Sequence, residues 1–129
     1  MNKYEKIFTV KREHLANVVE SGTSPVLSTP SLLCFIENTC MNSISNILNK
    51  DENNKKTCVG IKCELKHIKP SLIGDKIKCE SELVFIEKRK LYFKINVYSW
   101  RPGNNTNSIL IAECEHVRCL VPEDFYKWS

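Results

Sequence analysis

The amino-acid sequence predicts an α+β fold in which one long helix packs against a five-stranded antiparallel sheet. One segment, from Pro30 to about Leu48, has the apolar periodicity of a helix; one strand-like segment precedes it and four follow. The later segments are joined by short turns, which favours antiparallel pairing. A sheet of this size needs a cover for its apolar face, and only one long helix is available to provide it.

The chain begins with a strand and a loop that lead into the helix. Residues 3–10 alternate in polarity and are expected to form a strand, whereas residues 20–28 contain a glycine and a proline and are expected to form a loop. Thr29 is suited to cap the helix, and Pro30 would occupy its first position, where proline is favoured. The helix should end near Asn49, where a polar loop begins.

After that loop the apolar period changes from that of a helix to two. Residues 67–75 contain a proline and a glycine that end the first of the later strands, residues 87–90 are short enough for a hairpin, and residues 102–107 form a turn before a last strand at 108–121. The side chains expected to face the helix are Val59, Ile61, Cys63 and Leu65, then Ile77, Cys79, Leu83 and Phe85, then Leu91, Phe93, Ile95 and Val97. A five-stranded antiparallel sheet wrapped around a central helix is the hot-dog architecture.

Length and composition indicate one globular domain spanning residues 1–129. Apolar residues make up 42% of the chain and charged residues 26%, which are values of folded proteins. The net charge of +4 comes from lysines that are spread along the chain among acidic residues, so no nucleic-acid partner is expected. The charged N-terminal segment does not resemble a signal peptide, and no apolar run is long enough for a membrane span. We therefore expect a cytoplasmic protein with no membrane partner.

The seven cysteines do not predict a disulfide framework, because their number is odd and no CxxC motif occurs. Cys58 and Cys63, like Cys114 and Cys119, are five positions apart, which places the members of each pair on opposite faces of a regular strand. Free thiols in a reducing compartment are expected, with no metal and no cofactor.

Glu37 is unusual because it interrupts an apolar stripe of the predicted helix. The stripe consists of Leu33, Met41, Ile44 and Leu48. Burying a carboxylate without a partner is costly. Glu37 therefore either escapes to the rim of the helix or pairs with a lysine of the sheet, or it belongs to a functional site.

Three further residues favour a site. Thr29 lies two turns before Glu37, at the helix end where backbone N–H groups attract anions. His67 ends the inward row of its strand, where a packed or capping histidine is the ordinary alternative. Gly60 lies inside the same strand, where glycine commonly allows a close approach to the backbone. A hydroxyl, a carboxylate, an imidazole and a backbone position without a side chain could together supply the parts of acyl transfer: a nucleophile or base, a proton shuttle and oxyanion donors.

Three stretches carry a resemblance to a known family. They are TP-x6-E at residues 29–37, VGIKCELKHIKPSLIGDKIKCESEL at 59–83, and AECEHVRCLV at 112–121. In these the sequence resembles the hot-dog thioesterases related to fluoroacetyl-CoA thioesterase. The resemblance implies a catalytic set of Thr29, Glu37 and His67, and a substrate-binding role for Gly60 and Arg118.

The resemblance also implies a homodimer with its active site near the subunit interface. Pairing of exposed sheet edges between two copies gives an independent reason to expect one. One departure concerns the substrate, because the fluoroacetate-specific member has an aromatic lid before the helix, and residues 15–28 contain no aromatic residue. An ordinary acyl-CoA is therefore the expected substrate. His116 matches a histidine of the family, and its role is left open.

Hydrolysis of an acyl-CoA thioester is the leading hypothesis, with Glu37 acting either as the nucleophile or as the base for water. Hydration of an enoyl-CoA on the same fold is a second hypothesis. Hot-dog hydratases have an aspartate a few residues before a histidine, and none of the three aspartates, Asp51, Asp75 and Asp124, has a histidine at that interval. A non-catalytic acyl-CoA-binding protein is a third hypothesis, in which Glu37 would be dispensable.

Overall fold

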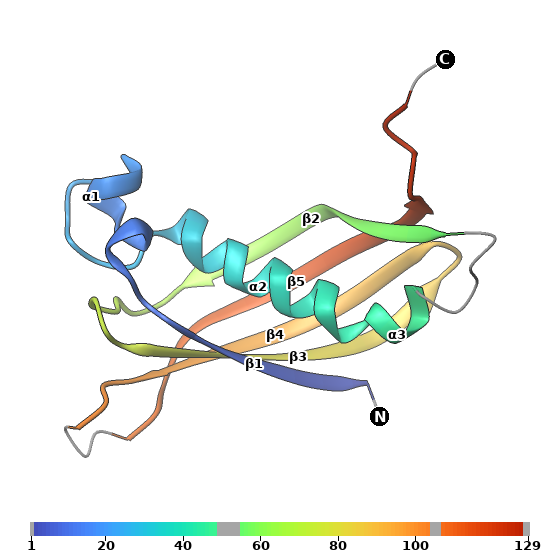
Figure 1. Ribbon diagram of the computed structural model, residues 1–129. Coiled ribbons are helices and arrows are strands. Elements are labelled where there is room, and N and C mark those ends of the chain that lie inside the picture. Colours follow the sequence, from blue (N-terminus) through green and yellow to red (C-terminus); the bar gives the residue numbers. More distant parts are fainter. Residues whose placement is uncertain (1, 49–54, 104–106, 128–129) are drawn as a thin grey trace.

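The predicted α+β architecture is confirmed by the computed structural model, which describes residues 2–48, 55–103 and 107–127. Its elements in chain order are β1 (Lys3–Thr9), the 3₁₀ helix η1 (Arg12–His14), α1 (Ala16–Val19), α2 (Thr29–Ser43), α3 (Ser45–Leu48), β2 (Lys56–His67), β3 (Lys76–Glu87), β4 (Lys90–Trp100) and β5 (Ile109–Pro122). All five strands pair antiparallel in one sheet with the order β1-β3-β4-β5-β2. The long helix α2 lies across one face of this sheet (Figure 1).

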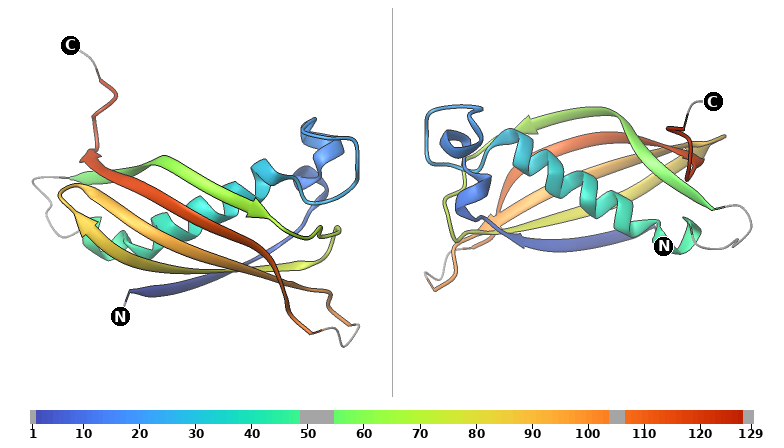
Figure 2. Two further views of the ribbon diagram at one scale, coloured as in Figure 1. Left: turned by 180° about the vertical axis from the view of Figure 1, so that it is seen from behind. Right: turned by 45° about the horizontal axis from the view of Figure 1, so that its top comes forward.

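The hydrophobic core lies between α2 and the sheet. The helix contributes Leu32, Ile36 and Cys40, all fully buried, and the sheet contributes the inward rows of β3 and β4. The row predicted for β4, Leu91, Phe93, Ile95 and Val97, is confirmed because every member is buried. In the part of the chain that the structure describes, no helix covers the opposite face of the sheet (Figure 2).

Helix α2 begins one residue earlier than predicted and is interrupted before its predicted end. The cap is Ser28, whose hydroxyl accepts a hydrogen bond from the N–H of Ser31 at 3.2 Å, so the prediction of Thr29 as the cap is wrong. The helix stops at Ser43, and α3 follows after Ile44. At the interruption Ile44 has non-helical dihedral angles (φ −110°, ψ 11°), and its N–H donates to the carbonyl of Met41 instead of that of Cys40.

A bulge in β2 changes which of its side chains face the helix. Its register with β5 shifts between Gly60 and Lys62, which leaves Ile61 as the extra residue. The expected inward row is therefore wrong for Val59 and Ile61, and Ile61 is 50% exposed. Inward positions before the bulge have even numbers and include Gly60, whereas those after it have odd numbers and include Cys63.

A second bulge, in β3, explains why Phe85 does not continue the inward row as predicted. The register with β4 shifts between Leu83 and Phe85. Phe85 is consequently paired with Tyr92 and stacks on its ring on the outer face, with 4.2 Å between the ring centroids. The hairpin predicted at residues 87–90 is confirmed, with Lys88 at a positive φ of 58° in its turn.

Several features were outside the sequence prediction. Helices η1 and α1 form between β1 and the loop before α2, and β2 pairs with β5 rather than with its chain neighbour β3. Residues 49–54 of the polar loop at 49–56 and residues 104–106 of the turn at 102–107 lie outside the described residues. None of the helices in the described ranges has the length and apolar character needed to cross a membrane.

Candidate active site

Two groups of polar side chains lie between α2 and the edge strand β2. The carboxylate cluster consists of Glu37, Cys58, Gly60, Cys63, His116 and Arg118. The threonine–histidine pair consists of Thr29 and His67. Every residue that the sequence predicted as catalytic or substrate-binding belongs to one of these groups.

Glu37 does not lie on the buried stripe of the helix, which corrects the sequence prediction. The buried side of α2 is centred on Leu32 and Ile36, so Glu37 lies at its border together with Met41, which is 38% exposed. Its carboxylate Oε2 accepts a hydrogen bond from Nη1 of Arg118 at 3.3 Å. The Glu37 side chain is 40% exposed and that of Arg118 is 7% exposed. The partner of the carboxylate is therefore a buried arginine rather than a lysine of the sheet.

Gly60 allows this carboxylate to approach β2. A Cβ atom at Gly60 would lie 2.5 Å from Oε2 of Glu37 and 3.0 Å from Cε1 of His116, and both distances are shorter than ordinary contact. The glycine thus makes room for the Glu37 side chain next to the bulge. This contact gives a physical reason for a glycine inside the strand.

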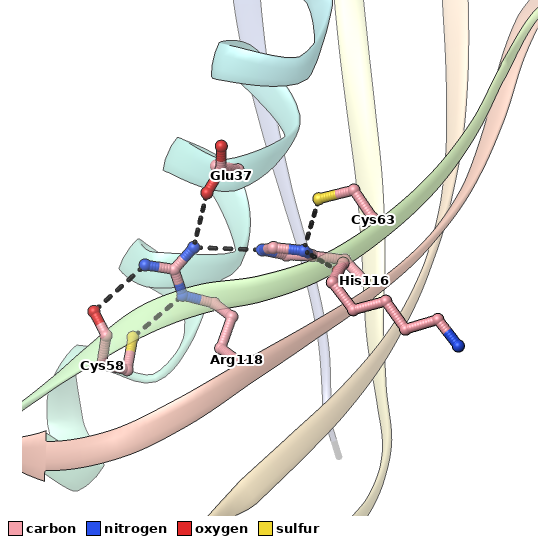
Figure 3. Close-up of polar contacts among 6 residues, drawn as sticks. Glu37, Cys58, Cys63, His116 and Arg118 are labelled. Carbon is pink, nitrogen blue, oxygen red and sulfur yellow. Dashed lines mark hydrogen bonds and ion pairs between the residues drawn. The ribbon is translucent and has the colours of Figure 1, made fainter.

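Arg118 contacts Glu37, Cys58 and His116, and Cys63 joins this network through His116 (Figure 3). Its Nε donates to the thiol sulfur of Cys58 at 3.0 Å, and its Nη2 donates to the carbonyl of the same residue at 3.1 Å. Its Nη1 faces both Glu37 and Nε2 of His116, which is 3.0 Å away. Since four of its five N–H groups have partners, the guanidinium is held at one end by Cys58 and presents the other end to Glu37.

His116 is almost completely buried beneath Glu37. Its Nδ1 is 2.9 Å from the carbonyl oxygen of Lys62 and 2.9 Å from the sulfur of Cys63. Burial lowers the pKa of His116 and the charge of Arg118 lowers it further, whereas the backbone of Lys62 and the charge of Glu37 oppose these effects. The ring is therefore neutral near pH 7.

The threonine–histidine pair lies at the start of α2. The Thr29 hydroxyl is 2.9 Å from Nδ1 of His67, which projects from the last position of β2. Its Nε2 is buried and has no hydrogen-bond partner among the described residues. Burial lowers the pKa of His67, opposed by a bond with the backbone of Lys69. This pair therefore offers a hydroxyl and a neutral imidazole with one nitrogen available.

Within one chain the two groups do not meet. No hydrogen bond or ion pair joins Thr29 or His67 to Glu37 in the described structure. Thr29 and Glu37 are eight positions apart in the helix, which is about 12 Å of rise along the axis. The structure therefore divides the predicted side chains between two groups, and a single chain does not bring all of them together.

The contributions of Cys58 and Cys63 were missed, because five positions apart on a regular strand would put them on opposite faces. The bulge brings both to the helix side, where they contact Arg118 and His116. Gly60 was the sequence signal for that bulge. Burial and the charge of Glu37 raise the pKa of Cys63, so its thiol stays protonated near pH 7. Among the described residues, no group of three or more His, Cys, Asp or Glu side chains is arranged to hold a metal ion.

Comparison with known proteins shows the family. A family model described as fluoroacetyl-CoA-specific thioesterase matches residues 10–124. A mutant of the fluoroacetyl-CoA-specific thioesterase FlK is 16% identical over 96% of this chain and 88% of its own, with a TM-score of 0.75. Another FlK mutant, in complex with acetyl-CoA, is 13% identical over 96% and 90%, with a TM-score of 0.79.

A hypothetical protein of Thermus thermophilus described as a thioesterase superfamily member is 17% identical over 95% of this chain and 82% of its own, with a TM-score of 0.78. No curated protein sequence matches the chain. The low identities make the structural likenesses evidence for the hot-dog fold, while the family match extends over most of the sequence. The chain therefore belongs to the fluoroacetyl-CoA-specific thioesterase family and is an acyl-CoA thioesterase.

Proposed function

We propose that the enzyme hydrolyses an ordinary, non-fluorinated acyl-CoA in the cytoplasm, with the carboxylate of Glu37 as its central catalytic group. The observation that carries this proposal is the placement of that carboxylate. Arg118 holds it beside the backbone of Gly60, and 40% of its side chain remains accessible. A thioester carbonyl lying along Gly60 is then within reach of Glu37.

The groups nearby match the steps of thioester hydrolysis. Glu37 either attacks the carbonyl carbon directly or removes a proton from the attacking water. The Thr29 hydroxyl stabilises the negative charge that develops on the carbonyl oxygen. The C–S bond then breaks to release the CoA thiolate, and the neutral ring of His67 relays to it the proton that the hydrolytic water gives up. Water supplies the hydroxyl group of the acid product.

A second copy of the chain completes the site in this proposal. Strand β2 is an edge strand, paired with β5 on one side only. Antiparallel pairing of two β2 strands about a two-fold axis can place Gly60 opposite His67 of the partner subunit. Glu37 of one subunit then faces Thr29 and His67 of the partner subunit, which closes the gap found within one chain.

The proposal of a non-fluorinated substrate rests on the segment before the helix. Residues 15–28 contain no aromatic side chain, so this segment has nothing equivalent to an aromatic lid over the acyl group. A panel of acyl-CoAs that includes acetyl-CoA and fluoroacetyl-CoA, followed with a thiol reagent, tests this choice. A preference for fluoroacetyl-CoA by a factor of ten or more contradicts it.

Replacement of Glu37 by glutamine tests the catalytic role. Glu37→Gln keeps the size of the side chain and one acceptor for Arg118, so we expect hydrolysis to fall by about a hundredfold or more. Stability should fall by no more than about 1 kcal/mol, because the ion pair is partly exposed and screened by solvent. Initial rates of CoA release and melting temperatures measure both effects.

Glu82→Gln, an exposed substitution on β3, serves as the matched control and should leave hydrolysis unchanged. Full activity in Glu37→Gln would show that the carboxylate is dispensable. A wild-type protein that binds acyl-CoA without releasing CoA would instead support a non-catalytic binding protein.

A further inference from the structure

The arrangement around His116 determines which of its ring nitrogens carries the proton. Every nitrogen of Arg118 is a donor at any accessible pH. Nε2 of His116, 3.0 Å from Nη1, must therefore accept, and the proton of the neutral ring resides on Nδ1. That N–H points to the carbonyl oxygen of Lys62, with the sulfur of Cys63 as a second acceptor at the same distance.

The carbonyl that His116 binds belongs to the bulge of β2. Lys62 directly follows Ile61, the residue that the bulge leaves without a partner in β5. Bulges leave backbone groups outside the regular ladder, and a buried carbonyl without a donor is costly. The Nδ1–H of His116 provides a donor at this point. The same bulge sets the position of Gly60, against which the Glu37 carboxylate rests.

We propose that Arg118 and His116 are positioning residues for Glu37, and that Arg118 acts by locking His116 in the tautomer that holds the bulge. Arg118 orients the carboxylate directly, and His116 keeps the backbone at Gly60 where the carboxylate fits. His116 neither gives nor takes a proton during turnover. The proposal rests on Glu37 as the catalytic group, and it assigns the guanidinium of Arg118 to the protein's own side chains rather than to the substrate.

The same geometry bears on Cys63. A Cys–His pair within hydrogen-bond distance would ordinarily suggest an imidazole that activates a thiol nucleophile. Here Nδ1 already carries the proton, so the sulfur receives a hydrogen bond and has no base to take its own proton. The cluster therefore has one catalytic group, Glu37, and not two.

Nitrogen NMR of the three histidines tests the tautomer without any activity measurement. The wild-type protein, labelled with ¹⁵N, should show the neutral ring of His116 protonated at Nδ1. His14 is an internal control with the opposite tautomer. The N–H of Lys11 donates to its Nδ1 at 2.9 Å, so the proton of its neutral ring must lie on Nε2. The titratable groups in contact with or acting on His116 are Arg118, Cys63 and Glu37. Protonation of His116 at Nε2 in the neutral ring would overturn the proposal.

Two substitutions separate positioning from proton transfer. The side-chain nitrogen of asparagine can replace Nδ1, whereas that of glutamine lies nearer to Nε2. We expect His116→Asn to keep kcat within about tenfold of the wild type and His116→Gln to lose about a hundredfold, with little change in KM. Both pH profiles of kcat should keep the wild-type shape. Equal losses in the two variants, or loss of one limb of the pH profile, would overturn the proposal.

The failure of this inference and that of the proposed function are distinguishable. A wild-type protein that hydrolyses no acyl-CoA refutes the function, while the NMR result still decides how His116 is held. A variant that does not fold leaves the NMR experiment on the wild type as the deciding one. Nδ1 protonation in the wild type supports the inference, and Nε2 protonation refutes it.

Discussion

A carboxylate on the border of the helix is tolerated because a buried cation faces it. Arg118 is held in place by Cys58 and cannot reach bulk water, so Glu37 is the group that balances its charge. Because the Glu37 side chain is 40% exposed, solvent screens this pair, and its net contribution to stability is small. At this scale the identity of each residue follows from its neighbours: Glu37 balances the charge of Arg118, and Gly60 leaves room for the Glu37 carboxylate.

Gly60→Ala tests the close approach of helix and strand. The added methyl group would lie 2.5 Å from Oε2 of Glu37, so the carboxylate must turn away and lose its contact with Arg118. We expect kcat to fall by about tenfold to a hundredfold, because a displacement of about 1 Å is enough for such a loss. Stability should fall modestly: the carboxylate ends a flexible side chain and can turn away, but the methyl group also lies 3.0 Å from Cε1 of the buried His116, which must shift by a few tenths of an ångström.

The control is Gly22→Ala, in the loop before α2, where the new methyl group would lie 3.4 Å from the Cβ of Ala16. This variant should keep the wild-type rate. Comparable rates for Gly60→Ala and Gly22→Ala would mean that the Gly60 contact is unimportant for turnover.

At the scale of elements, two adjacent residues at the start of α2 have different hydrogen-bond partners. Ser28 caps the helix, and Thr29, the next residue, directs its hydroxyl to His67. The sequence alone could not separate them, because serine and threonine are both good caps and stand side by side before the same proline. The bulge in β3 was equally hidden, since an extra residue changes no local propensity but reverses the face of every residue after it, and the bulge in β2 was marked only by Gly60.

The elements themselves were predictable because their signals are local. The helix follows from its apolar period, the hairpin from its length, and the inward row of β4 from strict alternation. Thr29, Glu37 and His67 were proposed as site residues from their residue types, their positions and the family resemblance, and their roles stay predictions. The pairing of β2 with β5, by contrast, depends on contacts between distant parts of the chain, and so does the role of Cys58.

Substitutions at the adjacent residues Ser28 and Thr29 should affect different properties, the first stability and the second hydrolysis. Ser28→Ala removes the cap and should lower the free energy of unfolding by about 1 kcal/mol. Thr29→Val leaves the cap intact and should keep stability within about 0.5 kcal/mol, while hydrolysis falls by about a hundredfold through loss of the hydroxyl. Denaturant melts and CoA-release rates distinguish them. A loss of stability in Thr29→Val as large as that in Ser28→Ala would identify Thr29 as a structural residue.

The connection between β2 and β3 should make stability depend on acid. Burial by itself raises the pKa of Asp75, but hydrogen bonds from Arg101 and from the N–H of Leu72 outweigh it, so the pKa of Asp75 lies below its ordinary value. A depressed folded-state pKa gives stability that is present above the unfolded-state pKa, near 4, and is lost as pH falls through the folded value. Asp75→Asn should therefore lose less stability than the wild type when melting is followed from about pH 5 to pH 2. Parallel decline of the two proteins would contradict this role.

The whole molecule leaves one long edge strand open. Strand β2 has 12 residues, is paired on one side only, and exposes Ile61 at its bulge. Such an edge invites pairing with another chain. It is also the strand that carries Gly60 and His67, the β2 residues of the two separated groups of the site. The proposed two-fold dimer through β2 would both cover the open edge and bring the two groups together.

Complementation between two inactive variants tests this account most directly. Glu37→Gln and His67→Ala are given different affinity tags, expressed together, and the mixed dimer is purified by both tags. If each site combines Glu37 of one subunit with His67 of the other, one site of the mixed dimer carries both substitutions and the other site carries neither. We therefore expect about half of the wild-type activity per dimer, although each variant alone is nearly inactive. A mixed dimer as inactive as its parents would contradict the account, because it would place Glu37 and His67 of the same chain in one site. Recovery of monomers only, at 14.9 kDa, would contradict it as well.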